Sequence, residues 1–244
     1  MILKTITFNI HHGQGIDEII DVKRQAELLK QYNPDVIFLQ EIDMYTQRVG
    51  DESQLDIISN YTGLYYRTIG INIRYRKGFY GTGILSRFPV EYCANFLTPQ
   101  TNISHEQRGI LYNKISFGTT KLHLFCVHLS TYKDERLLAL QELLKVINKI
   151  NKKEIIIVGG DFNVGITKIG NHKYEFVKED KFEEYNILGK KLNKITNFEE
   201  TWFSENGSGC IDTIFYSNNV DLKNIITIDN DYSDHYAVYA EFDI

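Results

Sequence analysis

The sequence has few of the residues that stabilise small secreted proteins or bind zinc. Its 244 residues include three cysteines, Cys93, Cys126 and Cys210, which are widely spaced and form no Cys-x-x-Cys pair. An odd number of isolated cysteines supports neither a disulfide framework nor a thiolate zinc site. We therefore expect free thiols and a fold that depends on its hydrophobic core.

Long apolar runs and interdomain linkers are also missing. No segment approaches the roughly 20 apolar residues of a membrane-spanning helix, and no basic leader opens the chain. We expect no integral membrane association and a cytoplasmic location, or secretion if a leader was removed. Because no Pro/Gly/Ser-rich or low-complexity tract divides the chain, we expect one domain over residues 1–244, and a monomer.

An excess of positive charge is absent too. The formal net charge of −5 argues against a protein whose main task is to coat polyanions. It does not exclude a nuclease, because a divalent metal and a local basic patch can hold a phosphodiester on an acidic protein. Arg67, Arg74, Arg76 and Lys77 form one such patch. The segment from Arg67 to Tyr80, which mixes these cations with aromatics, is expected to be a substrate-contacting loop.

Two parts of the sequence have a strand–helix–strand pattern. In the first, strands at 2–10 and 35–41 flank a helix at 21–32; in the second, strands at 121–129 and 154–158 flank a helix that begins near residue 134. The remaining patterns are mostly strands, at 64–71, 80–85, 90–97, 109–117, 211–216, 222–228 and 235–242. Together they predict an α/β fold of two packed sheets with helices outside.

Polar residues follow several of these apolar strands. Glu41 ends one strand, Asp161 and Asn163 follow the run Ile155 to Val158, and Ser233-Asp234-His235 precedes the last strand. The glycines Gly159 and Gly160 are expected to form a tight turn that points Asp161 outward. Strand ends of one sheet meet at a common edge, so these segments predict one shared site.

This set of residues suits metal-assisted phosphoester hydrolysis, which needs a metal, a base for water and donors to phosphoryl oxygens. Glu41 is the best candidate metal ligand, and Asn9 could orient it. Asp161 could position the nucleophile, while Asn163, His128 and His235 could donate to phosphate or transfer protons.

Each assignment has a structural alternative. Glu41 alone could be a solvated strand cap, and Gly-Gly-Asp-Phe-Asn an ordinary turn. His11 and His12 are expected in a loop, with at most one facing the site, because adjacent strand side chains point to opposite faces. Trp202 and the tyrosines are expected to be packing residues. The conjunction of polar strand ends favours the catalytic interpretation.

The motifs, in this order, resemble the endonuclease/exonuclease/phosphatase superfamily over essentially the full length. The matching segments are Phe8-Asn9-Ile10, Leu39-Gln40-Glu41, Val127-His128-Leu129, Gly160-Asp161-Phe162-Asn163, Ile211-Asp212 and Ser233-Asp234-His235. The resemblance implies a four-layer α-β-β-α sandwich and a hydrolase that uses Mg²⁺, or Mn²⁺ in its place. It implies that Asp212 holds His235 and that Asp234 adds negative charge near the metal.

Other segments, among them Asn9 to Gly13 and Arg108-Gly109, resemble a bacterial branch grouped with sphingomyelinase-like and glycosyl-phosphatidylinositol-related proteins. Arg108, Arg74, Arg76 and Lys77 are the candidate substrate-binding residues. The expected substrate is a phosphodiester in a lipid head group, nucleotide or nucleic acid. Two alternatives are a nuclease, favoured if the cations from Arg67 to Lys77 line the same groove as Glu41, and a catalytically silent binding module.

Overall fold

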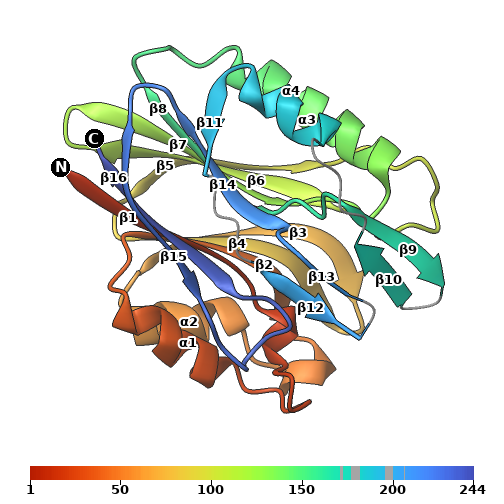
Figure 1. The fold of residues 1–244 in the computed structure, drawn as a ribbon. Helices are drawn as coiled ribbons and strands as arrows, with labels where there is room; N and C mark the ends of the chain where they lie inside the picture. Colours follow the sequence, from red (N-terminus) through yellow and green to blue (C-terminus); the bar gives the residue numbers. More distant parts are fainter. Residues whose placement is uncertain (171–172, 177–181, 196–199, 206) are drawn as a thin grey trace.

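The structure is a computed structural model, which describes all residues except 171–172, 177–181, 196–199 and 206. Two six-stranded mixed sheets pack face to face, and helices cover both outer faces (Figure 1). This arrangement confirms the four-layer α/β sandwich predicted from the sequence. No helix of the described residues is long and apolar enough to cross a bilayer.

The first sheet lies against α1 (Val22–Gln31) and α2 (Gln54–Thr62). Its strands, in spatial order, are β15 (Asp221–Ile228), β16 (Ala237–Asp243), β1 (Ile2–Asn9), β2 (Val36–Met44), β4 (Gly78–Ser86) and β3 (Tyr66–Tyr75).

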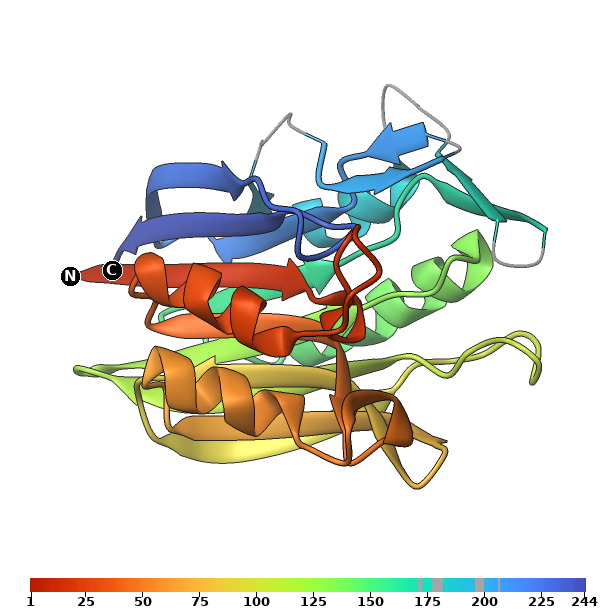
Figure 2. The same ribbon diagram turned by 90° about the horizontal axis from the view of Figure 1, so that it is seen from below.

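The second sheet lies against α3 (Lys133–Ile147) and α4 (Glu183–Gly189). Its strands, in spatial order, are β11 (Leu192–Lys194), β14 (Asp212–Ser217), β8 (Ile155–Asp161), β7 (Thr120–His128), β6 (Gly109–Phe117) and β5 (Val90–Leu97). Two small sheets, β9 (Ile166–Gly170) with β10 (Lys173–Phe176) and β12 (Trp202–Ser204) with β13 (Gly207–Gly209), lie at the end of the sandwich opposite the chain termini (Figure 2).

Strand β8 shows why the sequence contains continuous apolar runs. Ile155 and Ile157 pack between the two sheets, whereas Ile156 and Val158 pack in the layer formed with α3 and α4. A strand covered on both faces has no polar face. Each fully buried aliphatic side chain stabilises the fold by about 1.5–3 kcal/mol.

Parallel pairing brings the polar strand ends to one edge. β1 runs parallel to β2, which places Asn9 opposite Gln40 and beside Glu41. β7 runs parallel to β8 with His128 opposite Asp161, and antiparallel β14 begins with Asp212 opposite the same Asp161. Both predicted β–α–β units are therefore confirmed, and their strand ends meet at one mouth.

The two glycines before Asp161 lie within β8, so the predicted tight turn at this point is wrong. A Cβ on Gly159 would lie 2.7 Å from the Phe38 ring, and one on Gly160 would lie 2.0 Å from the Val127 carbonyl oxygen. The Phe38 ring of the facing sheet and the backbone of the neighbouring strand β7, rather than a turn, exclude side chains here. The chain leaves the sheet only after Asp161.

Helices α2 and α4 and the short strands β9 to β13 are not predicted from the sequence. Helix α2 has a detectable start signal, since the Ser53 hydroxyl accepts a hydrogen bond from the Asp56 backbone N–H at 3.2 Å. Its end signal is Gly63, which adopts a left-handed φ of 74°. Ser59 and Tyr61 in its second half weaken the helical pattern.

Candidate active site

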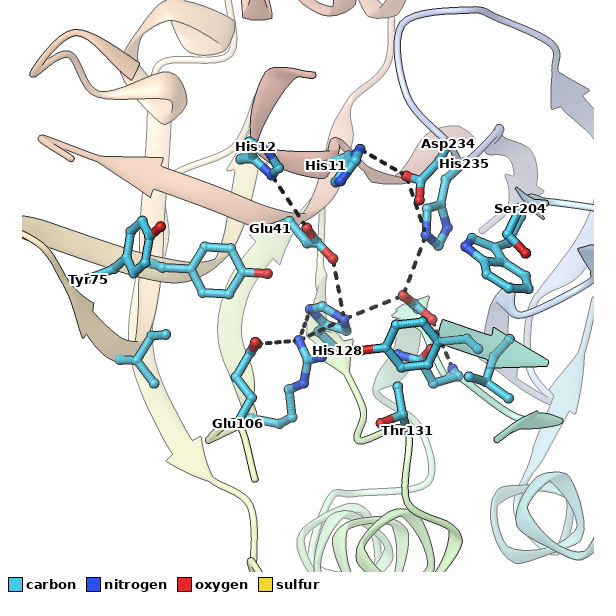
Figure 3. Close-up of a pocket in the computed structure, with 18 of the residues that line it drawn as sticks. His11, His12, Glu41, Tyr75, Glu106, His128, Thr131, Ser204, Asp234 and His235 are labelled. Carbon is cyan, nitrogen blue, oxygen red and sulfur yellow. Dashed lines mark hydrogen bonds and ion pairs between the residues drawn. The ribbon is translucent and has the colours of Figure 1, made fainter. Parts of the chain in front are cut away.

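A cavity of about 460 Å³ opens at the mouth where the two sheets meet. Both sheets and their loops line it, and the labelled side chains converge on its centre (Figure 3). The lining residues are His11, His12, Glu41, Arg48, Ile73, Tyr75, Tyr80, Glu106, Arg108, His128, Thr131, Asp161, Asn163, Ile166, Tyr174, Trp202, Ser204, Asp234 and His235.

A β-bulge points Glu41 into this cavity. The register between β2 and β4 shifts between Leu39 and Ile42, and Glu41 has a left-handed φ of 60°. That conformation is unfavourable for a residue with a side chain and is typical of functional positions. The bulge therefore turns the carboxylate out of the ladder and toward the other sheet.

Asn9 connects the acids of the two sheets. Its side-chain Nδ2 donates to Asp161 Oδ2 at 3.0 Å and to Glu41 Oε1 at 3.3 Å. Its Oδ1 accepts from the His11 backbone N–H at 3.1 Å. In this orientation Asn9 aligns the two carboxylates and leaves metal binding to their oxygens.

Asp212 and His235 form a buried pair beside Asp161. His235 Nδ1 lies 2.8 Å from Asp212 Oδ2, and His235 Nε2 lies 4.0 Å from Asp161 Oδ2. The Asp212 backbone N–H donates to the Thr201 hydroxyl at 3.0 Å, which fixes the start of β14. The pairing leaves His235 Nε2 facing the cavity.

His128 lies between the acids and a cation. Its Nε2 is 3.5 Å from Asp161 Oδ2 and 2.9 Å from Arg108 Nη1. The same Arg108 nitrogen lies 2.7 Å from Glu106 Oε1. Arg108 thus brings a positive charge into the site from the loop that precedes β6.

Neighbouring charges move the pKa values of the two central acids in opposite directions. Burial alone would raise the pKa of Glu41, but the surrounding groups, including His12 and His128, hold it well below its usual value. Burial and the adjacent Asp212 carboxylate raise the pKa of Asp161. Glu41 is therefore a permanent anion, and Asp161 binds a proton more readily than an ordinary aspartate.

The two strand-end histidines also differ. Burial alone would lower the pKa of His235, but the Asp212 and Asp234 carboxylates raise it to about 10. Burial and the charge of Arg108 lower the pKa of His128 well below its usual value. At neutral pH His235 is an imidazolium that donates from Nε2, and His128 is a neutral imidazole.

Asn163 and Asp234 complete the set of predicted residues. Asn163 has a left-handed φ of 50° and donates from Nδ2 to the Leu129 carbonyl at 3.0 Å. Asp234 Oδ1 lies 3.4 Å from His11 Nδ1 and 3.9 Å from His235 Nε2. Both residues line the cavity, so the structure brings Asn9, Glu41, Arg108, His128, Asp161, Asn163, Asp212, Asp234 and His235 together.

The expectation that at most one of His11 and His12 faces the site is wrong. They lie in a short 3₁₀ turn, His11–Gly13, and both have left-handed φ angles, 45° and 44°. Side-chain alternation applies to strands and not to this turn. Both imidazoles line the cavity (Figure 3).

The expected substrate loop is a β-hairpin in which only Arg76 and Lys77 connect β3 and β4. Arg67 lies at the far end of β3 and pairs with Asp56 of α2. Strand alternation points Ile73 and Tyr75 into the cavity, whereas the Arg74 guanidinium stacks on Phe79, 5.5 Å from its ring centre. Arg74, Arg76 and Lys77 are exposed and do not belong to the cavity lining.

The cavity also contains residues that sequence reasoning missed. Arg48 is held by the buried Asp43, with Nε to Oδ2 at 2.7 Å and Nη2 to Oδ1 at 2.9 Å. Its guanidinium lies 4.7 Å from the Tyr75 ring centre and 5.9 Å from that of Tyr80. The sequence signal that could have identified this pair is its position, because Asp43 and Arg48 follow the candidate ligand Glu41 within one short segment. Trp202 packs as predicted, and also lines the cavity.

The donors fit a divalent cation. The side chains of His11, His12 and Glu41 each offer one ligand atom, and these atoms lie within 4.8 Å of one another. Asp161, Asp212 and His235 form a second such group. Because Asp212 and His235 already pair with each other, the group around Glu41 is the better metal site.

Comparison with known proteins gives one family. Residues 6–235 match the sequence model of the Endonuclease/Exonuclease/phosphatase family. YbhP of Escherichia coli (strain K12), an uncharacterized protein, is 27% identical over 172 residues, a match that covers 66% of this chain and 66% of YbhP.

Solved structures of this fold are similar over the full chain. An endonuclease/exonuclease/phosphatase from Beutenbergia cavernae has a TM-score of 0.79 at 17% sequence identity. The superposition covers 100% of this chain and 72% of the Beutenbergia chain. TDP2 of D. rerio, solved with a single-strand DNA product, has a TM-score of 0.73 at 20% sequence identity, and the superposition covers 100% of this chain and 99% of the TDP2 chain. SmcL has a TM-score of 0.66 at 20% sequence identity, and the superposition covers 100% of this chain and 99% of the SmcL chain. At these identities the likeness shows the fold alone.

Proposed function

Because the chain belongs to the endonuclease/exonuclease/phosphatase family, we propose that it is a Mg²⁺-dependent phosphodiesterase. The observation that carries the proposal is the convergence of Glu41 from one sheet and Asp161 from the other on a single amide, Asn9. A silent binding module has no need to hold two carboxylates this close, because their repulsion must be offset.

In the proposed reaction Asp161 aligns the attacking water and accepts its proton. Its pKa is raised by burial and by Asp212, which makes it a stronger base than an exposed aspartate. Asn9 and the Asn163 backbone N–H, at 3.0 and 2.9 Å, fix the two oxygens of this carboxylate. The water would therefore meet a base with little freedom to rotate.

His235 and His128 would hold the phosphoryl oxygens. The imidazolium of His235 donates from Nε2 into the cavity while Asp212 fixes its Nδ1. A donor fixed in this way loses little entropy when negative charge develops on phosphorus. Arg108 adds a second cation on the His128 side.

Glu41 would hold the metal, with Asn9 orienting it and Asp234 contributing charge nearby. Mg²⁺, or Mn²⁺ in its place, would polarise a phosphoryl oxygen when bound.

The test is a substrate panel with the purified chain, Mg²⁺ or Mn²⁺, and the variant Asp161→Asn as the blank. The panel contains bis(p-nitrophenyl) phosphate, p-nitrophenyl phosphate, sphingomyelin, inositol phosphates and oligonucleotides. We expect metal-dependent turnover of the diester that exceeds turnover of the monoester and disappears in the blank. Preferential turnover of the monoester, or a diesterase activity that survives in Asp161→Asn, would contradict the proposal.

A nuclease is the second candidate within the same chemistry. The condition that favours it, a groove shared by Glu41 and the cations from Arg67 to Lys77, is not met by the cavity lining. A small phosphodiester such as a lipid head group, as in the sphingomyelinase-like branch, is therefore the first substrate we propose. Cleavage of the oligonucleotides in the panel would favour the nuclease over a phosphodiesterase of small substrates.

A further inference from the structure

We infer that His11 and His12 ligate the metal together with Glu41, so that the site prefers Mn²⁺, Co²⁺ or Zn²⁺ to Mg²⁺. The inference rests on the proposed function and revises its metal, because Mg²⁺ would then activate the enzyme only as the weaker-binding ion. The inference itself concerns ion binding. Mg²⁺ takes oxygen ligands and keeps several waters, whereas imidazole nitrogen suits first-row transition ions. Two imidazoles beside one carboxylate therefore change which ion the site selects.

The spacing of the three donors is close to that of a metal site. Their ligand atoms lie within 4.8 Å of one another, and His12 Nδ1 lies 3.9 Å from Glu41 Oε2. Ligands bound at about 2.1 Å lie no more than about 4.2 Å apart. His12 Nδ1 and Glu41 Oε2 already lie within this limit, and the His11 nitrogen, within 4.8 Å of its two neighbours, has to move closer to join them on one ion.

His12 places its Nδ1 beside Glu41, 3.9 Å from Oε2. Its Nε2 lies 3.1 Å from the Gln14 side-chain oxygen, which can only accept a hydrogen bond. In a neutral imidazole the proton would lie on Nε2, so a metal ion could displace the proton that His12 shares with Glu41 and bind at Nδ1. Metal-bound histidines are held by an acceptor on their second nitrogen in this manner.

The backbone of the turn is fixed in a costly conformation that serves this placement. Two consecutive residues, His11 and His12, adopt left-handed angles, which are unfavourable for residues with a side chain. Hydrogen bonds from Gly13 N to the Ile10 carbonyl at 2.8 Å and from Gln54 Nε2 to the His12 carbonyl at 2.6 Å maintain it. The two rings meet edge to face with centroids 4.5 Å apart, and both reach the cavity.

The competing explanation is that the two histidines only donate hydrogen bonds to a substrate phosphate. His11 Nδ1, 3.4 Å from Asp234 Oδ1, is compatible with either role. The explanations differ in what happens without substrate. Ligands contribute to the affinity for the ion alone, whereas phosphate donors do not.

The experiment measures ion binding by the full chain after chelator treatment, without substrate. Calorimetry gives the Kd values of Mg²⁺ and Mn²⁺, and visible absorption of bound Co²⁺ reports nitrogen ligands. The variants are His11→Gln, His12→Gln and Glu41→Gln. His123→Gln is the control because it removes an imidazole outside the cavity, where His123 pairs with Glu154.

We expect Mn²⁺ to bind wild type at least about tenfold more tightly than Mg²⁺. His12→Gln and His11→Gln should each weaken Mn²⁺ by about 10–100-fold, with Mg²⁺ changed less than about threefold. Glu41→Gln should weaken the binding of both ions, and His123→Gln the binding of neither. Unchanged Mn²⁺ affinity and Co²⁺ absorption in both histidine variants would overturn the inference.

A measurement on the wild-type protein tests the inference even if a variant fails to fold. Titration with Zn²⁺ should shift the ¹⁵N resonance of His12 Nδ1 and leave those of His123 in place, and an unmoved His12 resonance would overturn the inference. Histidine-dependent ion binding without turnover of any phosphodiester would refute the proposed function alone. Turnover with Mg²⁺ and histidine-independent ion binding would refute this inference alone.

Discussion

The carboxylate of Asp212 shows how much the site depends on single residues. It is buried, and within the described part of the chain its Oδ1 has no hydrogen-bond partner. The imidazolium of His235 is therefore its principal compensation. A buried charge that loses such a partner destabilises a protein strongly.

Replacing His235 by alanine should consequently affect both activity and stability. We expect kcat to fall by about 10²–10⁴-fold, because a positioned proton donor is lost. The free energy of unfolding should fall by about 3–5 kcal/mol, because Asp212 is left unpaired. Diesterase kinetics and urea denaturation measure the two effects.

The double variant with Asp212→Asn separates the two effects. It should recover part of the lost stability while kcat stays no higher than in His235→Ala, since residues that act as a unit are not additive. Fully additive losses in kcat would show that the two residues act independently.

Arg48 is a residue whose effect should depend on the substrate. Because it lies on the tyrosine-lined wall of the cavity and away from Asp161, Arg48→Met should raise KM for a large natural diester by about tenfold, which is about 1.4 kcal/mol of binding. KM for a small aryl diester should change little. Arg67→Met is the matched control, because Arg67 pairs with Asp56 outside the cavity. Equal losses on both substrates would indicate a folding defect instead.

Among the elements, the segment 98–108 depends on one side chain of α3. Glu135 Oε1 accepts from the Thr101 backbone N–H at 2.8 Å and lies 2.6 Å from His105 Nδ1, and its Oε2 accepts from the Ser130 hydroxyl at 2.6 Å. This segment ends at Arg108, so α3 helps to position a cation of the site.

The acid stability of the protein should reflect this connection. Burial alone would raise the pKa of Glu135, but hydrogen bonds from Ser130, His105 and Thr101 lower it to about 2. A carboxyl group whose pKa is lower in the folded than in the unfolded protein stabilises the fold at pH values above its unfolded pKa, here near 4.5. That stability is lost as the pH falls toward the folded pKa of about 2.

Glu135→Gln should cost about 1–3 kcal/mol at pH 7 and much less at pH 2. Thermal unfolding across this range measures the difference. Glu142→Gln on the exposed face of the same helix is the control. A loss in Glu135→Gln that is independent of pH would exclude the ionised carboxylate as its cause.

The elements also show what the sequence can predict. Buried strands such as β8 were identified because their apolar runs have no polar face, and strands 90–97 and 109–117 coincide with β5 and β6. The polar side chains that end these strands and line the cavity were predicted for the same reason. His11 and His12 were expected in a loop, but that both face the cavity was not predicted, because left-handed angles in residues other than glycine leave no pattern in the sequence.

At the scale of the molecule, the site belongs to two sheets that pack against each other through their inner faces. Phe38 of β2 fills the space above Gly159 of β8, where a Cβ would lie 2.7 Å from its ring. The distance between Glu41 and Asp161 is thus set by packing a few residues away. Interiors transmit such displacements because they are close-packed.

Gly159→Ala should push the sheets apart or displace Phe38. Overpacking of this kind costs about 1–3 kcal/mol, and kcat should fall although no side chain of the cavity is altered. Urea denaturation and diesterase kinetics measure the two effects. Gly189→Ala, where an added Cβ meets no atom within 4 Å, should leave both unchanged. An active, fully stable Gly159→Ala protein would show that the sheets adjust independently of the site.

The order in which the strands occur in the chain affects how the protein is made. β16, the last strand, inserts between β15 and β1, and His235 lies just before it. While the ribosome is still adding these residues, β1 has an open edge and the site lacks an imidazole. The candidate site is therefore incomplete in a nascent chain until β16 has been synthesised.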